Sequence, residues 1–228
     1  MLETMRRNVI FFDLDGTLAD SMTHVAAIVT SIAVEELGIP ETTIREKLPY
    51  LLSLPANESM PQLAALGGKD VAFLAAIMKR RPDAVSQPLA LFPEVPAALK
   101  ALADSGYTMV LSTNSPQSGL PERLREAGIE RCFRVVLGSD LGTGATKGPE
   151  HVRLAADELG IPLSELGGVS ILVGDQEGDM RLAKQFDMAA IGCARVNTPE
   201  ALKRAGADRI VMNLEGLPDV LKQLDASL

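Results

Sequence analysis

Apolar positions follow two different periods along the chain, and the change between them marks its organisation. Over residues 1–18 and 89–228, short continuous apolar runs alternate with segments in which apolar residues have helical spacing. The runs predict buried strands, and the spaced segments predict amphipathic helices. Residues 19–88 show the helical spacing without convincing strand alternation. The pattern therefore predicts an α/β domain with an all-helical insert after its first strand.

The predicted strands and helices of this α/β domain alternate along the chain. We expect strands over residues 9–12, 108–113, 134–137, 169–174, 189–192 and 209–211. We expect helices over residues 93–105, 121–127, 150–159, 180–186, 199–205 and 217–224. Strands separated by helical crossovers form parallel sheets with helices on both faces. The fold class is therefore predicted to be α/β, with a Rossmann-like parallel sheet.

The insert is expected to form a small domain of its own. A helix over residues 19–37 should be followed by shorter helical pieces at residues 43–48, 59–66 and 69–79. The residues predicted to separate these pieces are helix breakers: Pro49, Pro55, Pro61 and Gly67-Gly68. We therefore expect a discontinuous core domain of residues 1–18 and 89–228 and a cap domain of residues 19–88. Gln87-Pro88 is the expected second boundary.

The amino-acid composition and net charge favour some classes of protein and argue against others. The 228 residues are 46% hydrophobic and 23% charged, which is typical of a globular protein, and the chain contains no apolar run of membrane-spanning length. We expect an unprocessed cytoplasmic protein. The net charge of −8 argues against a nucleic-acid or anionic-membrane surface, but small anionic ligands can still bind in a locally basic pocket. Cys132 and Cys193 lack metal or redox spacing and are expected to be reduced, packed thiols.

Two aspartates end the first predicted strand. Asp13 and Asp15 follow a continuous apolar run and are separated by one residue, and Gly16 then permits a sharp reversal of the chain. Two like charges so close together need a counter-ion. Magnesium supplies it economically, because it binds through one or two carboxylates together with water and substrate phosphate.

Further polar residues follow the other predicted strands. Thr113 and Asn114 follow the second strand, Lys147 lies in the loop beyond the third, and Asp175 follows the fourth. Ligands of open parallel sheets bind outside the carboxyl ends of the strands. We therefore expect these side chains to meet at one sheet edge, where the acids suit a divalent cation and the hydroxyl and lysine suit phosphate oxygens.

At these positions the sequence resembles the haloacid dehalogenase (HAD)-like hydrolase superfamily. The branch it resembles includes phosphoglycolate phosphatase and β-phosphoglucomutase and has a helical C1-type cap. Four motifs match in order: Phe-Asp-Leu-Asp-Gly-Thr-Leu at residues 12–18, Leu-Ser-Thr-Asn at 111–114, Lys147, and Val-Gly-Asp-Gln-Glu-Gly-Asp at 173–179. With the insert placed directly after the first motif, the resemblance covers nearly the whole chain.

The resemblance implies a covalent mechanism and a metal. Asp13 would attack phosphorus and form an aspartyl-phosphate, while Asp15 would protonate the leaving oxygen and then activate the hydrolytic water. Mg²⁺ would be held by the Asp13 carboxylate, the Asp15 carbonyl and Asp175, with Asp179 nearby or acting through water. Asp179 also has the alternative interpretation of a helix cap.

The resemblance also implies a phosphate site. Thr113 and Lys147 would hold the phosphoryl oxygens, and backbone amides around Gly16 and Asn114 would add donors. Gly148 stands where the family usually has a proline after the lysine, and Ser112 competes with Thr113 for the hydroxyl role. Glu177, within the fourth motif, is expected on the surface, as are His24 and His151 outside the motifs.

The predicted function is a Mg²⁺-dependent phosphomonoester hydrolase. Its expected substrate and partner is a small phosphorylated metabolite, such as phosphoglycolate or a sugar phosphate, and its oligomeric state is left open. A phosphomutase of the β-phosphoglucomutase type and a non-catalytic phosphometabolite-binding protein are the alternatives. Specificity is expected to reside in residues 19–88, where the basic candidates are Arg45, Lys47, Lys69 and Arg80.

Overall fold

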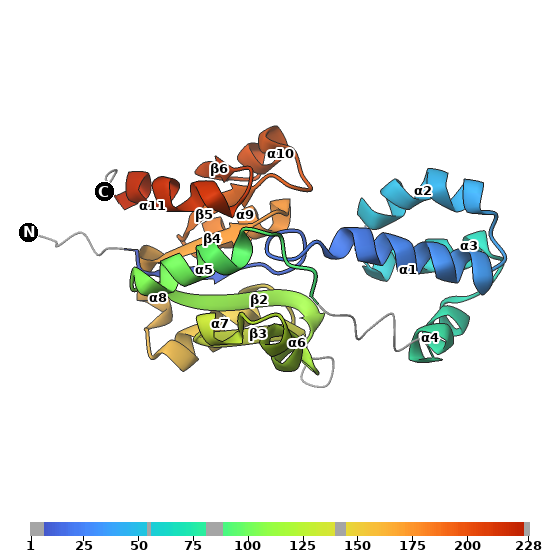
Figure 1. Cartoon of the computed structure of the whole chain (residues 1–228), viewed down its shortest axis with the longest axis horizontal. Coiled ribbons are helices and arrows are strands. Elements are labelled where there is room, and N and C mark those ends of the chain that lie inside the picture. Colours follow the sequence, from blue (N-terminus) through green and yellow to red (C-terminus); the bar gives the residue numbers. More distant parts are fainter. Residues whose placement is uncertain (1–6, 54–55, 81–88, 140–144, 226–228) are drawn as a thin grey trace, which may run out of the picture. The chain divides into compact units, whose positions relative to one another are not determined.

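The α/β part of the chain is built on a six-stranded parallel sheet. In the computed structural model (Figure 1), the strand order is β3-β2-β1-β4-β5-β6, with β1 (Val9–Phe12) in the interior of the sheet. The structure describes residues 7–53, 56–80, 89–139 and 145–225. Contacts divide the chain into two compact units, Met1–Asp20 with Leu89–Leu228, and Ser21–Pro88.

The pairing register of β1 aligns its carboxyl end with positions in the two neighbouring strands, β2 and β4. Phe12, the last residue of β1, pairs with Leu111 of β2 (Thr108–Pro116) and with Val173 of β4 (Ser170–Gly174). The backbone continues this alignment, because the Asp13 amide donates to the Val173 carbonyl at 3.0 Å. The residues that follow these three positions therefore emerge at one edge of the sheet.

The remaining elements of this unit alternate around the sheet. The other strands are β3 (Val135–Ser139), β5 (Ala189–Cys193) and β6 (Arg209–Val211). The helices are α5 (Val95–Asp104), α6 (Leu120–Glu126), α7 (Pro149–Leu159), α8 (Leu163–Val169), α9 (Glu177–Gln185), α10 (Pro199–Arg204) and α11 (Leu217–Asp225), with short 3-10 turns at Glu130–Cys132 and Leu214–Gly216. Each of β1 to β6 overlaps a segment where the sequence predicts a strand.

Side chains of β1 alternate between two apolar cores. Ile10 and Phe12 join the cluster covered by α5, α6 and α11, whereas Val9 and Phe11 join the cluster covered by α7 to α10. All four residues are buried. A strand covered on both faces needs apolar residues at every position, which explains the continuous run.

Residues of the second unit form four helices around their own core. These are α1 (Ser21–Glu35), α2 (Glu41–Ser53), α3 (Ala56–Leu66) and α4 (Val71–Arg80). Their inward positions form one buried cluster: Ile32, Ala33, Leu37, Ile39, Ile44, Leu51, Leu63, Ala64, Leu74 and Ile77. The described residues of the helical insert therefore form a hydrophobic core of their own.

Two predicted breaks in the insert are wrong. Pro49 lies inside α2 and Pro61 inside α3, so neither residue separates helices. An interior proline costs a helix roughly 3 kcal/mol or more. Burial of Leu51 in α2 and Leu63 in α3 offsets that cost, and tertiary packing thereby overrides local propensity. Pro55 and the boundary at Gln87-Pro88 lie outside the described residues.

Two further elements differ from the prediction. Strand β2 continues to Pro116, so Thr113 and Asn114 lie within the strand rather than in a loop after it. A register shift between Ser112 and Pro116 lets β2 stay paired with β3. Helix α8 was not predicted, because Gly167 and Gly168 are poor helix formers. Among the described residues, no helix is long and apolar enough to cross a membrane.

Adjacent glycines in α8 provide a test of the packing of this helix against the end of α9. A Cβ on Gly167 would overlap the Phe186 carbonyl oxygen, whereas a Cβ on Gly168 would meet no atom within 4 Å. We expect Gly167→Ala to lower the free energy of unfolding by about 2 kcal/mol, the cost of overpacking. Gly168→Ala should raise it by roughly 0.5–1 kcal/mol, because alanine favours the helix. Urea denaturation of both variants measures the difference, and equal effects would contradict the close approach.

Candidate active site

Three buried carboxylates meet at the carboxyl edge of the sheet. Asp13 follows β1, Asp175 follows β4, and Asp179 lies in the first turn of α9. One oxygen from each lies within 4.8 Å of the others, and the residues are 5%, 0% and 2% exposed. The register of the sheet brings Asp13 and Asp175 together, and α9 turns Asp179 back toward them.

Lys147 is the cation of this cluster. Its Nζ lies 2.8 Å from Oδ1 of Asp13 and 2.5 Å from Oδ1 of Asp179, and its side chain is 11% exposed. Buried charges are tolerated when they are paired and hydrogen-bonded. Three carboxylates and one ammonium still leave an excess of two negative charges when all are ionised. The cluster therefore needs further positive charge or a proton.

Burial and the excess of negative charge shift the pKa values of Asp13, Asp175 and Lys147. Burial raises the pKa of Asp13 well above its usual value, Lys147 opposes this, and the charges of Asp179 and Asp175 add to the rise. Burial also raises the pKa of Asp175. For Lys147, burial alone would lower the pKa, but the carboxylates of Asp13 and Asp179 outweigh it and raise the pKa. Lys147 is consequently an ammonium at neutral pH.

Neutral donors fix the carboxylate of Asp175. Thr17 Oγ1 donates to its Oδ1 at 3.2 Å, and Gln176 Nε2 donates to its Oδ2 at 2.6 Å. Asn197 Nδ2 donates to the Asp175 carbonyl at 2.9 Å and to Gln176 Oε1 at 3.1 Å. Both carboxylate oxygens keep lone pairs for a further ligand.

The turn after β1 requires glycine. Gly16 has φ +83°, and a Cβ there would lie 2.6 Å from Oδ2 of Asp175. Its amide donates to the Ala19 carbonyl at 2.8 Å. The expected role of the Gly16 amide as a phosphate donor does not fit this geometry, since its proton already closes the turn.

Asp15 lies apart from the three buried acids and is partly exposed. Its Oδ2 accepts a hydrogen bond from Thr113 Oγ1 at 3.2 Å and another from Ser115 Oγ at 2.8 Å. The Ser115 amide in turn donates to Thr113 Oγ1 at 3.0 Å. The two aspartates of the first motif therefore occupy different environments, one buried beside a lysine and one held by hydroxyl groups.

Asn114 and Lys147 share a depression of about 320 Å³. Asp179 and Arg181 also line it. The Asn114 side chain is exposed, and its Oδ1 accepts from Ser139 Oγ at 3.4 Å. Lys147 and Asp179 connect the depression with the carboxylate cluster.

His151 is buried, contrary to the prediction of a surface position. It is 1% exposed at the start of α7, and its Nδ1 lies 3.0 Å from Ser112 Oγ. Burial lowers the pKa of its imidazole. Ser112, the competitor of Thr113 for the hydroxyl role, thus points to α7, whereas Thr113 points to Asp15. Glu177 lies on the partly exposed side of α9, paired with Arg181 at 3.0 Å.

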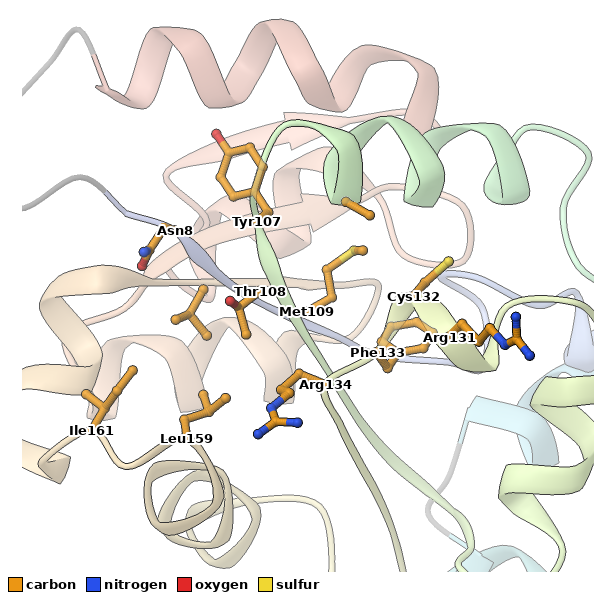
Figure 2. A pocket seen from close by; sticks show the side chains of 12 residues that line it. Asn8, Tyr107, Thr108, Met109, Arg131, Cys132, Phe133, Arg134, Leu159 and Ile161 are labelled. Carbon is orange, nitrogen blue, oxygen red and sulfur yellow. The ribbon is translucent and has the colours of Figure 1, made fainter.

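Another pocket lies away from these residues. A cavity of about 630 Å³ (Figure 2) is lined by Val9 and Thr108, the first residues of β1 and β2, and therefore lies at the opposite edge of the sheet. The guanidinium groups of Arg131 and Arg134 point apart in this view. None of the predicted site residues lines this cavity, and its polar groups do not converge on one ligand position.

Sequence reasoning missed several residues that hold the site together. Ser115, Gln176 and Asn197 contact Asp15 or Asp175 but belong to no predicted role. Ser115 and Gln176 adjoin predicted site residues, so their positions were a usable signal. Asn197 follows β5 and carries no local pattern that distinguishes it from a turn residue.

The donor set at the acid cluster fits a divalent cation. It consists of carboxylate oxygens, which hard cations such as Mg²⁺ prefer. The excess of two negative charges matches the charge of one such ion. A buried metal site of this type is consistent with the raised pKa values, because a bound cation would supply the positive charge that the cluster lacks.

This fold and this arrangement of acids define one class of protein. The chain belongs to the haloacid dehalogenase-like hydrolase family, whose model matches residues 10–193. It is 31% identical to the probable phosphatase IndB of Dickeya dadantii over 210 residues, which cover 89% of this chain and 88% of that protein. It is 28% identical to the phosphoglycolate phosphatase of Vibrio parahaemolyticus over 222 residues, which cover 93% and 95%.

Solved structures agree on the fold. The crystal structure of a predicted phosphoglycolate phosphatase from Haemophilus somnus has a TM-score of 0.74 and 20% identity, and the match covers 96% of this chain and 99% of that chain. The predicted family, the Rossmann-like α/β fold and the phosphatase class of enzyme are thereby confirmed.

A thermal-shift measurement tests the metal site without relying on activity. Millimolar Mg²⁺ should raise the Tm of the wild type, and a concentration of 100 Kd corresponds to about 2.7 kcal/mol of stabilisation. Asp175→Asn should lose most of this shift, because one ligand charge is removed. Asp104→Asn, at an exposed position paired with Lys100, is the matched control and should keep the shift. An Asp175→Asn shift equal to that of the wild type would exclude Asp175 as a ligand.

Proposed function

We propose that the chain is a Mg²⁺-dependent phosphomonoester hydrolase that works through an aspartyl-phosphate on Asp13. The observation that supports this most directly is the contact of Lys147 with Asp13 and Asp179 beside Asp175. This arrangement combines a carboxylate nucleophile, a phosphate-binding cation and oxygen ligands for a metal within one buried cluster. Phosphoryl transfer depends mainly on such positioning and charge neutralisation.

Asp13 is the proposed nucleophile. A carboxylate oxygen of Asp13 attacks phosphorus while the bond from phosphorus to the ester oxygen breaks, which leaves an aspartyl-phosphate and an alcohol. The attacking group must be ionised. Lys147 supports that state, because its ammonium stabilises the carboxylate at 2.8 Å.

Asp15 is the proposed proton shuttle. It gives a proton to the departing ester oxygen in the first step and takes one from water in the second, when the water oxygen attacks phosphorus and the bond to Asp13 breaks. Its partly exposed position, separate from the buried cluster, suits a group that must exchange protons with substrate and water.

Lys147 and Thr113 are proposed to hold the phosphoryl oxygens. The ammonium acts as a point charge, the hydroxyl as a hydrogen-bond donor, and the backbone amide of Asn114 is proposed to add a further donor. Lys147 lines the depression beside the cluster and is therefore accessible from it. Gly16 is proposed to act through the turn that it closes, since its amide already has a partner.

Mg²⁺ is proposed to be bound by the carboxylates of Asp13 and Asp175 and by the Asp15 carbonyl. When bound, the ion would neutralise charge on the phosphoryl group. Asp179 is proposed to act indirectly, because its Oδ1 contacts Lys147 and its Oδ2 accepts from the Gln176 amide at 3.1 Å. This second contact also confirms the helix-capping interpretation of Asp179.

The substrate is proposed to be a small organic phosphate such as phosphoglycolate or a sugar phosphate. The named phosphoglycolate phosphatase among the relatives supports this choice. The helical unit, predicted as residues 19–88, is proposed to act as the cap that selects the substrate. Arg45 is paired with Glu41 at 2.8 Å, and Lys69 lies over the ring of Phe73, so both have local partners.

Lys47, a basic residue of the helical unit, lines a pocket. This pocket, of about 420 Å³, also includes Tyr50 and Leu51 of α2 and Leu66 of α3. Together with Arg80 at the end of α4, Lys47 is therefore the first candidate for mutagenesis of specificity. Product analysis with sugar phosphates separates a hydrolase from a phosphomutase.

Substitution of the nucleophile tests the proposed mechanism. We expect Asp13→Asn to lower phosphatase activity by at least roughly 10³-fold on any phosphate ester, because an amide cannot form the intermediate. The fold should persist, since the substitution also reduces charge repulsion within the cluster. Asp104→Asn serves as the control. Retained turnover of an aryl phosphate by Asp13→Asn would overturn the mechanism, and an inactive wild type across a broad ester panel would favour a non-catalytic binding protein.

A further inference from the structure

Ser115 shares one oxygen of Asp15 with Thr113. The Ser115 hydroxyl lies 2.8 Å from Asp15 Oδ2, a typical length for a hydroxyl bond to oxygen, whereas Thr113 Oγ1 lies at 3.2 Å. Ser115 is part of β2, whose backbone fixes both residues relative to the sheet. The shorter and better contact is therefore made by the residue that carries no assigned role.

The hydroxyl groups of Thr113 and Ser115 can have different roles, because each has only one proton to donate. A hydroxyl has one proton to donate, and Thr113 gives its proton to Asp15 in this structure. If Thr113 donates to a phosphoryl oxygen when substrate binds, its bond to Asp15 is lost. Ser115 is then the remaining donor to Asp15 Oδ2 among the described residues. The Ser115 amide also donates to Thr113 Oγ1, so it helps to orient that hydroxyl.

We propose that Ser115 is a positioning residue for the acid and base chemistry of Asp15. Its hydroxyl holds Oδ2 in place while Thr113 changes partner, and this orients Oδ1 as the oxygen that exchanges protons with substrate and water. The two described hydrogen bonds to the Asp15 carboxylate both end on Oδ2, which leaves Oδ1 for this task. The inference rests on the proposed hydrolase function and deepens it.

The consequence for the reaction concerns the leaving group. In the first step Oδ1 transfers its proton to the ester oxygen as the bond to phosphorus breaks, and in the second it accepts a proton from the attacking water. An alkoxide leaving group depends strongly on that proton, whereas p-nitrophenolate leaves readily as an anion. Loss of the Ser115 hydroxyl should therefore slow the first step more for alkyl esters than for aryl esters.

The test compares kcat/KM for glycerol phosphate and p-nitrophenyl phosphate, because kcat/KM reports the first irreversible step. General acid catalysis contributes roughly 10²–10⁴-fold, so misorientation of the acid should cost a measurable part of it. We expect Ser115→Ala to lower kcat/KM at least about tenfold for the alkyl ester and less than about threefold for the aryl ester. Ser115→Thr, which keeps a hydroxyl, should restore most of the loss.

The controls distinguish this role from a structural one. Ser105→Ala removes an exposed hydroxyl at the end of α5 and should leave both rates unchanged. The Tm of Ser115→Ala should remain close to that of the wild type. An equal loss for both esters, no loss for either, or failure of Ser115→Thr to restore the rate would overturn the role of Ser115 while leaving the hydrolase intact. A wild type inactive on these two esters and across a broad panel of phosphate esters would instead overturn the proposed function.

Discussion

Repulsion among three buried carboxylates is the constraint on which the site depends. Asp13, Asp175 and Asp179 lie within a few ångströms of one another and away from water. Such a group is stable only with compensating charge, and Lys147 supplies part of it through two short contacts. Asp13 and Asp175 directly follow β1 and β4, and Asp179 lies in the first turn of α9. Relief of their mutual repulsion would therefore favour the binding of a cation among them.

The same cluster separates the roles of the two aspartates in the first motif. Asp13 follows the strand into the buried cluster, where burial raises its pKa and Lys147 opposes that effect. Asp15, two positions later, turns toward the hydroxyls of Thr113 and Ser115. The turn closed by Gly16 produces this divergence, because it reverses the chain within a few residues. Two identical side chains thereby lie in different environments.

The residues of the proposed chemistry and the helical insert belong to different compact units of the chain. Every residue in the proposed chemistry belongs to the unit of Met1–Asp20 and Leu89–Leu228, which has its own two apolar cores. The helical unit has a separate core and a pocket lined by Lys47 and Tyr50. Independent cores allow one unit to change without loss of the other. This organisation suits a fixed reaction combined with variable substrate selection.

The sequence by itself determined the alternation of strands and helices and the acids that follow β1 and β4. These features are local, because a run of consecutive apolar residues predicts a buried strand and the polar residues directly after the run mark its end. Tertiary structure alone decided the contacts of Lys147, the Ser112–His151 pair and the hydrogen bonds of Ser115 and Asn197, because their partners are distant in sequence. Tertiary packing also keeps α2 and α3 continuous across Pro49 and Pro61, because burial of the helical core outweighs the low helix propensity of proline.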